Sequence, residues 1–169
     1  MKTKQLSSKQ LIALVLILIG TVSSIFGITG LTKSSSEDPY ESRNGIVMVY
    51  ATVYDNEGNS EAGMGTGWAI GTPGQPIQYI VTNGHVVNKA YTYPRYDSSL
   101  YGGEIDVFFS AAENDYVKAK VVYFSPQEEK DIAILQLPSP TDKRTALTLR
   151  DSGDIKIGDT AYALGYPGN

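Results

Sequence analysis

The chain has 169 residues, of which 41% are hydrophobic, so it can bury one modest core but not two complete domains. Its formal net charge is -4 and its basic residues form no cluster, which excludes a nucleic-acid partner. The absence of cysteine excludes a disulfide, a thiolate metal site and a cysteine nucleophile, and the single histidine excludes a multi-histidine metal site.

Residues 1–31 predict a membrane-associated segment. Lys2, Lys4 and Lys9 precede an uncharged stretch, 11–31, which as a helix would span roughly 31 Å, close to the thickness of the hydrocarbon layer. A basic flank stays in the cytoplasm, so the rest of the chain is expected outside it. The same stretch also fits a cleaved signal peptide. The expected location is therefore the cell membrane, as a single-pass protein with its body outside, or secretion if the segment is removed.

A polar linker, 32–44, is followed by residues that favour short strands. Residues 46–54 are rich in β-branched and aromatic side chains and end at a turn signal, and residues 67–71 and 78–82 flank a Gly-Thr-Pro-Gly turn typical of a hairpin. Further strands are predicted at 104–109, 116–124 and 132–137, the last ended by Pro138 and Pro140. Six short strands predict an all-β fold, a small closed barrel. A loop and a seventh strand, 159–165, follow.

Two residues stand out as candidates for chemistry. His85 comes directly after a predicted strand, and Asp131 opens another. A serine hydrolase needs an imidazole to accept the proton of its hydroxyl, and a carboxylate to fix the tautomer of that imidazole. Such groups must be held rigidly, which suits the ends of barrel strands.

Several motifs support this interpretation. Gly65-Thr-Gly-Trp-Ala-Ile70, Val81-Thr-Asn-Gly-His-Val-Val87 and Asp131-Ile-Ala-Ile-Leu-Gln-Leu137 resemble, in this order, the first-barrel motifs of the trypsin-like serine proteases. They are most similar to the bacterial HtrA/DegP-type branch. Residues 149–168 resemble the entry of that branch into its second barrel.

This resemblance covers residues 45–169 and implies a chymotrypsin-like double β-barrel. The first barrel would occupy 45–140, and the inter-barrel linker with the start of the second barrel would occupy 141–169. By motif position, the resemblance makes His85 the general base and Asp131 the carboxylate that orients it. It also implies protein or peptide substrates, and chemistry that needs no metal or organic cofactor. The sequence indicates no particular oligomeric state.

One departure from the family pattern is important. The Gly-x-Ser-Gly-Gly motif that carries the nucleophile is absent. Ser152 lacks the glycine pair that shapes an oxyanion hole and comes too soon after Asp131, so it is not expected to be a nucleophile. We therefore expect the N-terminal fragment, inactive alone, of a serine endopeptidase that acts outside the cytoplasm. The alternative is a catalytically inactive, membrane-tethered binding or sensing module of the same fold.

Overall fold

The computed structural model describes residues 39–93, 102–149 and 151–166, all of which belong to one compact unit, 37–169. The predicted membrane or signal segment, 1–31, lies outside these ranges. Within them, no helix combines the length and the apolar character that crossing a membrane requires. The end of the predicted linker forms two short helical turns, α2 (Pro39–Ser42) and η1 (Arg43–Gly45).

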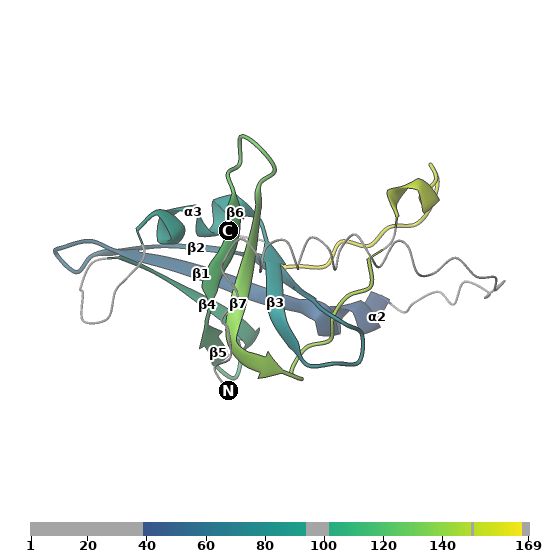
Figure 1. Ribbon diagram of the computed structural model, residues 1–169, viewed down its shortest axis with the longest axis horizontal. Coiled ribbons are helices and arrows are strands. Elements are labelled where there is room, and N and C mark those ends of the chain that lie inside the picture. Colours follow the sequence, from purple (N-terminus) through teal and green to yellow (C-terminus); the bar gives the residue numbers. More distant parts are fainter. Residues whose placement is uncertain (1–38, 94–101, 150, 167–169) are drawn as a thin grey trace, which may run out of the picture. The chain divides into compact units, whose positions relative to one another are not determined.

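The described chain is built around an antiparallel sheet (Figure 1). Its strands are β1 (Ile46–Tyr54), β2 (Ser60–Ile70), β3 (Ile77–Thr82), β4 (Gly102–Ser110), β5 (Asp115–Lys118), β6 (Lys120–Ser125) and β7 (Ile132–Thr141). Their order in space is β5-β4-β1-β2-β3-β7-β6. The two edge strands, β5 and β6, are separated in the chain only by Ala119, whose N–H donates to the Ile105 carbonyl at 2.8 Å.

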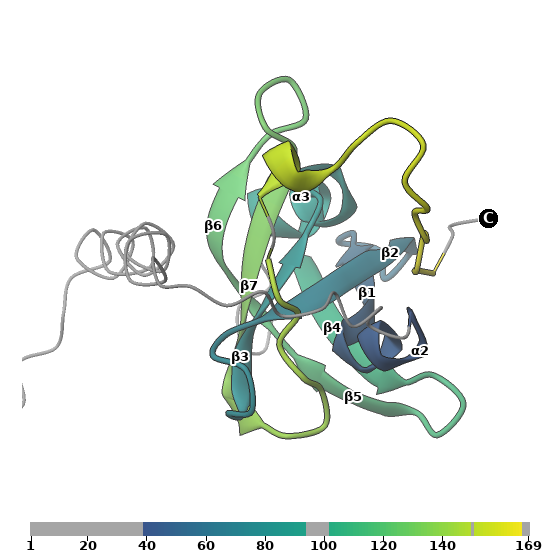
Figure 2. The same ribbon diagram turned by 90° about the vertical axis from the view of Figure 1, so that its right-hand side faces the viewer.

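One bent segment thus pairs with β4 by its first half and with β7 by its second half. The sheet must curl to allow this, as Figure 2 shows, and the helix α3 (Gly84–Thr92) covers one end of it. A mostly β chain with a curled antiparallel sheet agrees with the first barrel predicted from the sequence. The second barrel stays a prediction, since no strand follows Thr141 in the described part of the chain.

The core follows the two-residue period of the strands. Every second residue of β1, β4 and β7 points inward, and the apolar side chains at these positions are almost fully buried. They are Val47, Val49, Ala51, Ile105, Val107, Phe109, Ala133, Leu135 and Leu137. Val87 and Ala90 of α3 belong to the same cluster. Apolar packing therefore holds α3 against the sheet. Burying a side chain of the size of Val87 stabilises the fold by about 1.5–3 kcal/mol.

Strand β2 is longer than the sequence predicts, because it begins at Ser60 rather than at Gly67. Glycine usually weakens a strand, so the glycines of this segment conceal it. Here they allow close packing. A Cβ on Gly65 would lie 2.5 Å from Cγ2 of Val86, and one on Gly67 would lie 2.6 Å from Cγ2 of Ile80.

Two predictions about the end of the sheet are wrong. Strand β7 does not stop at Pro138 but runs to Thr141, which pairs with Ile77. Pro138 and Pro140 are tolerated in β7 because β6 pairs with β7 only as far as Gln136. Their missing backbone N–H groups therefore break no hydrogen bond between β6 and β7. The strand predicted at 159–165 does not form, because no described strand lies beside it to satisfy its backbone groups.

Candidate active site

The local structure around His85 is a strand-to-helix turn. Strand β3 ends at Thr82, and α3 begins at Gly84, so the histidine stands in the first turn of the helix. The helix continues for nine residues, to Thr92. A Cβ on Gly84 would collide with the Ser125 carbonyl oxygen and would also lie 3.4 Å from Oδ1 of Asp131. Glycine therefore allows the turn that carries His85 to lie directly against the turn that carries Asp131.

Asp131 occupies the last position of the turn between β6 and β7. Its φ of 52° is in the left-handed region, which aspartate tolerates better than most residues. Its own N–H donates to the Pro126 carbonyl at 2.9 Å. This backbone conformation is therefore held by the turn and directs the carboxylate to the start of α3.

The structure brings the two sequence-predicted residues into contact. Oδ2 of Asp131 is 2.8 Å from Nδ1 of His85, and Oδ1 accepts the backbone N–H of His85 at 2.9 Å. The imidazole is 52% exposed and the carboxylate 23% exposed. A carboxylate at Nδ1 favours the tautomer that carries its proton there, and this leaves Nε2 able to accept a proton from a substrate or a nucleophile.

The surroundings of Asp131 stabilise its ionised form. The backbone N–H of His85, followed by the imidazole, lowers the pKa of this carboxyl below its usual value, and Asn83 adds to the effect. The carboxylate also lies at the N-terminus of α3, where a helix dipole favours negative charge. Asp131 is consequently an anion at neutral pH and can stabilise an imidazolium on His85.

Sequence reasoning overlooked a third member of this cluster. Nδ2 of Asn83 is 3.2 Å from both the backbone oxygen and Oδ2 of Asp131. The only sequence signal was its position two residues before His85, in the same motif.

A pair of threonines connects the histidine strand to the last described residues. Oγ1 of Thr82 donates to the Thr66 carbonyl at 2.8 Å, and Oγ1 of Thr66 accepts the N–H of Tyr166, also at 2.8 Å. Tyr166 is thereby attached to Thr66 of β2, whose carbonyl also accepts the hydroxyl of Thr82 at the end of β3.

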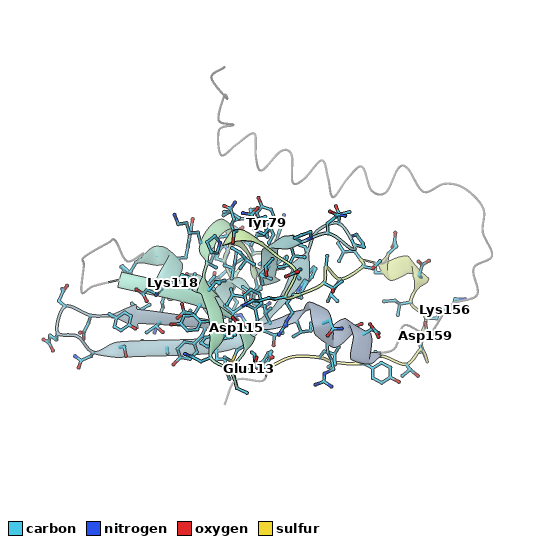
Figure 3. The ribbon with its side chains drawn as sticks, turned by 90° about the horizontal axis from the view of Figure 1, so that it is seen from below. Tyr79, Glu113, Asp115, Lys118, Lys156 and Asp159 are labelled. Atoms are coloured by element: carbon cyan, nitrogen blue, oxygen red, sulfur yellow. The ribbon has the colours of Figure 1, made fainter. Side chains whose placement is uncertain are left out.

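Ser152 lies apart from the histidine. It begins η2 (Ser152–Asp154), an exposed turn that Asp151 caps by accepting the N–H of Gly153. In Figure 1 this turn stands well away from α3, and Figure 3 shows the nearby Lys156 and Asp159 beyond the ends of the strands. The described ranges also hold no group of three or more acidic, histidine or cysteine side chains that could bind a metal ion.

Comparison with known proteins places this geometry in a family. The family model described as "Trypsin-like peptidase domain" matches residues 65–169, more than half of the chain. The chain belongs to the trypsin-like peptidase family. Both His85 and Asp131 lie within the matched residues.

Two curated relatives of the chain carry the names of proteases. The chain is 29% identical over 89 residues to the periplasmic pH-dependent serine endoprotease DegQ of Escherichia coli, a match of 53% of this chain and 16% of that protein. It is equally identical, again over 53% of its length, to Protease Do-like 1, chloroplastic, of Arabidopsis thaliana, of which 17% is matched. The matched residues thus span about a sixth of the length of these relatives.

Two solved structures resemble the chain. The crystal structure of Deg5 aligns with a TM-score of 0.45 at 18% identity, over 76% of this chain and 56% of that one. The active form of the Rv3671c protease from M. tuberculosis aligns with a TM-score of 0.35 at 21% identity, over 69% of this chain and 45% of that one.

Proposed function

We propose that this chain supplies the histidine and the aspartate of the catalytic triad of a serine endopeptidase. His85 is the general base: its Nε2 takes the proton of the attacking serine hydroxyl and returns it to the leaving amine. Asp131 fixes the tautomer of the imidazole and stabilises its cationic form. The observation that carries the proposal is the double contact between the two residues, with Oδ2 2.8 Å from Nδ1 and Oδ1 bonded to the backbone N–H of His85.

The nucleophile is proposed to come from outside the 169 residues. No Gly-x-Ser-Gly-Gly sequence occurs among them, and Ser152 stands in an exposed turn away from α3. A serine and the N–H donors of an oxyanion hole must both be present before an acyl-enzyme can form. These residues are therefore proposed to be a fragment that does not hydrolyse peptides by itself.

The proposed substrates are proteins, and the proposed site of action is outside the cytoplasm. The three lysines before the uncharged stretch 11–31 support export, either with a membrane anchor or after removal of a signal peptide. A curated relative is named as a periplasmic endoprotease, which is consistent with this location.

The test uses the full-length protein and its His85→Ala variant. Hydrolysis of a fluorescent casein and labelling by a fluorophosphonate probe are measured for both. Loss of the base is expected to lower kcat by about 10⁴-fold or more, because the triad members act as a unit. Ser152→Ala is the control, and its activity should equal that of the wild type.

Undiminished hydrolysis by His85→Ala would contradict the proposal. A full-length wild type that neither hydrolyses casein nor reacts with the probe would instead favour the inactive, membrane-tethered module of the same fold.

A further inference from the structure

Asn83 occupies the N-cap position of α3 but does not cap the helix. An asparagine at this position usually accepts the N–H of the second or third helical residue through its side-chain oxygen. Here its side chain makes no such bond. The N–H of His85, the second helical residue, is accepted by Oδ1 of Asp131 instead.

The side chain of Asn83 donates in the opposite direction, across to Asp131. Its Nδ2 lies 3.2 Å from the backbone oxygen of Asp131 and 3.2 Å from Oδ2. Oδ2 is also the atom that contacts the imidazole. The two residues have therefore exchanged roles: Asp131 caps the helix of Asn83, and Asn83 binds the turn of Asp131.

We infer that Asn83 is a positioning residue for the His85–Asp131 pair, whose side-chain amide fixes the orientation of the Asp131 carboxylate. The inference rests on the proposed function of that pair.

The geometry explains why a second donor matters. The χ2 torsion of an aspartate has a broad and roughly two-fold profile, so a single hydrogen bond leaves the carboxylate plane poorly fixed. In this site Oδ1 is held by the backbone of His85 and Oδ2 by both the imidazole and Asn83. The bond from Asn83 to the backbone oxygen also supports the left-handed conformation of Asp131, whose N–H is already bonded to Pro126. Both the backbone and the carboxylate of Asp131 are thus restrained by Asn83.

Asn83→Asp separates this role from helix capping. Aspartate caps helices as well as asparagine does and suits the positive end of the helix dipole, so a residue needed only as a cap would tolerate the exchange. A residue needed as a donor would not tolerate it, because the exchange replaces an N–H donor by a second carboxylate beside Asp131. Asn83→Ala removes the donor without adding charge. Asn88→Ala is the matched control, because Asn88 is on the same helix and its side-chain oxygen accepts from Thr92.

The experiment measures two quantities on the full-length protein and these three variants. The first is the titration of the Asp131 carboxyl by carbon-13 NMR, with the signal assigned by its loss in Asp131→Asn. The second is the pH profile of kcat and KM for peptide hydrolysis. We expect the pKa of Asp131 to rise in Asn83→Ala and further in Asn83→Asp, and to stay unchanged in Asn88→Ala. At neutral pH, kcat should fall about ten-fold in Asn83→Ala, with little change in KM, as for a lost hydrogen bond to a charged group.

The titration does not depend on hydrolysis, so the two proposals fail separately. An Asp131 pKa that is unchanged in Asn83→Asp, in protein that circular dichroism shows to be folded, would overturn the positioning role even if the enzyme is active. The expected rise in a protein without peptidase activity would support the positioning role and would count against the proposed function instead. If Asn83→Asp does not fold, the Asn83→Ala titration decides the same question.

Discussion

Two aspartates, Asp131 in the turn before β7 and Asp106 within β4, show how a carboxylate is prepared for different roles. Each side chain lies near a basic side chain, although burial acts more strongly on Asp106 than on Asp131. Nevertheless the pKa of Asp131 is lowered and that of Asp106 is raised. For Asp106 burial is the main cause, and the negative charge of Glu104 adds to it. Lys118, with its Nζ 3.8 Å from Oδ1, opposes this only in part.

The difference lies in burial and in the hydrogen-bond donors that the backbone leaves free. The carboxylate of Asp131 lies against the first turn of α3, where the backbone N–H groups have no hydrogen-bond partner within the helix. Asp106 lies in the middle of β4, between β1 and β5, where the backbone groups serve the ladder. Its buried Oδ1 has no hydrogen-bond partner in the described part of the chain. The donors directed at Asp131 thus lower its pKa, whereas Lys118 only partly offsets the effect of burial on Asp106.

The largest expected effect concerns activity. Asp131→Asn in the full-length protein should lower kcat/KM about 10⁴-fold, because an amide does not fix the imidazole tautomer that the mechanism requires. Asp106→Asn should leave kcat/KM near that of the wild type. Comparable losses in the two variants would show that the contrast between these carboxylates has no functional meaning.

The close approach of the two turns at the active site can be tested next. Gly84→Ala should reduce the free energy of unfolding by about 2 kcal/mol, because its methyl group would overlap the Ser125 carbonyl, which is backbone and cannot rotate away. Urea denaturation measures this. Gly63→Ala in β2 is the control, since a Cβ there would meet nothing closer than 3.9 Å. Equal stability of the two variants would contradict the packing described for the His85 turn.

The opposite pKa shifts predict opposite pH dependences of stability. A lowered folded-state pKa means that Asp131 contributes stability above the ordinary carboxyl value of about 3.9, and that this is lost as the pH falls through the lowered pKa. A raised folded-state pKa means that Asp106 favours folding below about 3.9, and that this is lost as the pH rises toward the raised pKa.

Urea midpoints at about pH 3 and pH 7 test both signs. Asp131→Asn should be less stable than the wild type at pH 7, and the deficit should shrink on acidification. Asp106→Asn should compare more favourably with the wild type at pH 7 than at pH 3, by up to about 1 kcal/mol. Parallel pH dependences in the two variants would be inconsistent with the shifts described here.

The sequence predicted the parts of this molecule that depend on local pattern. The β-branched and aromatic residues of 46–54, with the turn signal after them, predicted β1 with its observed bounds. The motifs around His85 and Asp131 predicted a contact between residues 46 apart in the chain. The direction of the Asn83 side chain has no such signal, because an N-cap asparagine normally bonds to its own helix. The first half of β2 was not predicted, because its glycines are weak strand formers. The reason for glycine at position 65 is its close packing against Val86, which lies in α3. Residues 159–165 were predicted to form a strand, but a strand also needs a neighbouring strand to pair with, and local pattern does not supply one.

The smallest expected effect concerns the connection between β3 and the last described residues. Thr66→Val keeps the shape of the side chain but removes the hydroxyl that accepts the Tyr166 N–H. Because the bond is partly buried and neutral, its loss should cost about 1 kcal/mol or less of global stability, while amide exchange at Tyr166 should become measurably faster.

Thr52→Val in β1, another threonine of the sheet, is the control for this exchange. The Asp131 titration should be unaffected by Thr66→Val, since the carboxylate receives its donors from His85 and Asn83 and none from Thr66. A change in the Asp131 pKa would show that the donors at the pair depend on how residues 165 and 166 are attached to β2. The difference between the pKa values of Asp131 and Asp106 would then depend on a hydrogen-bond network that extends beyond the Asp131 turn and the start of α3.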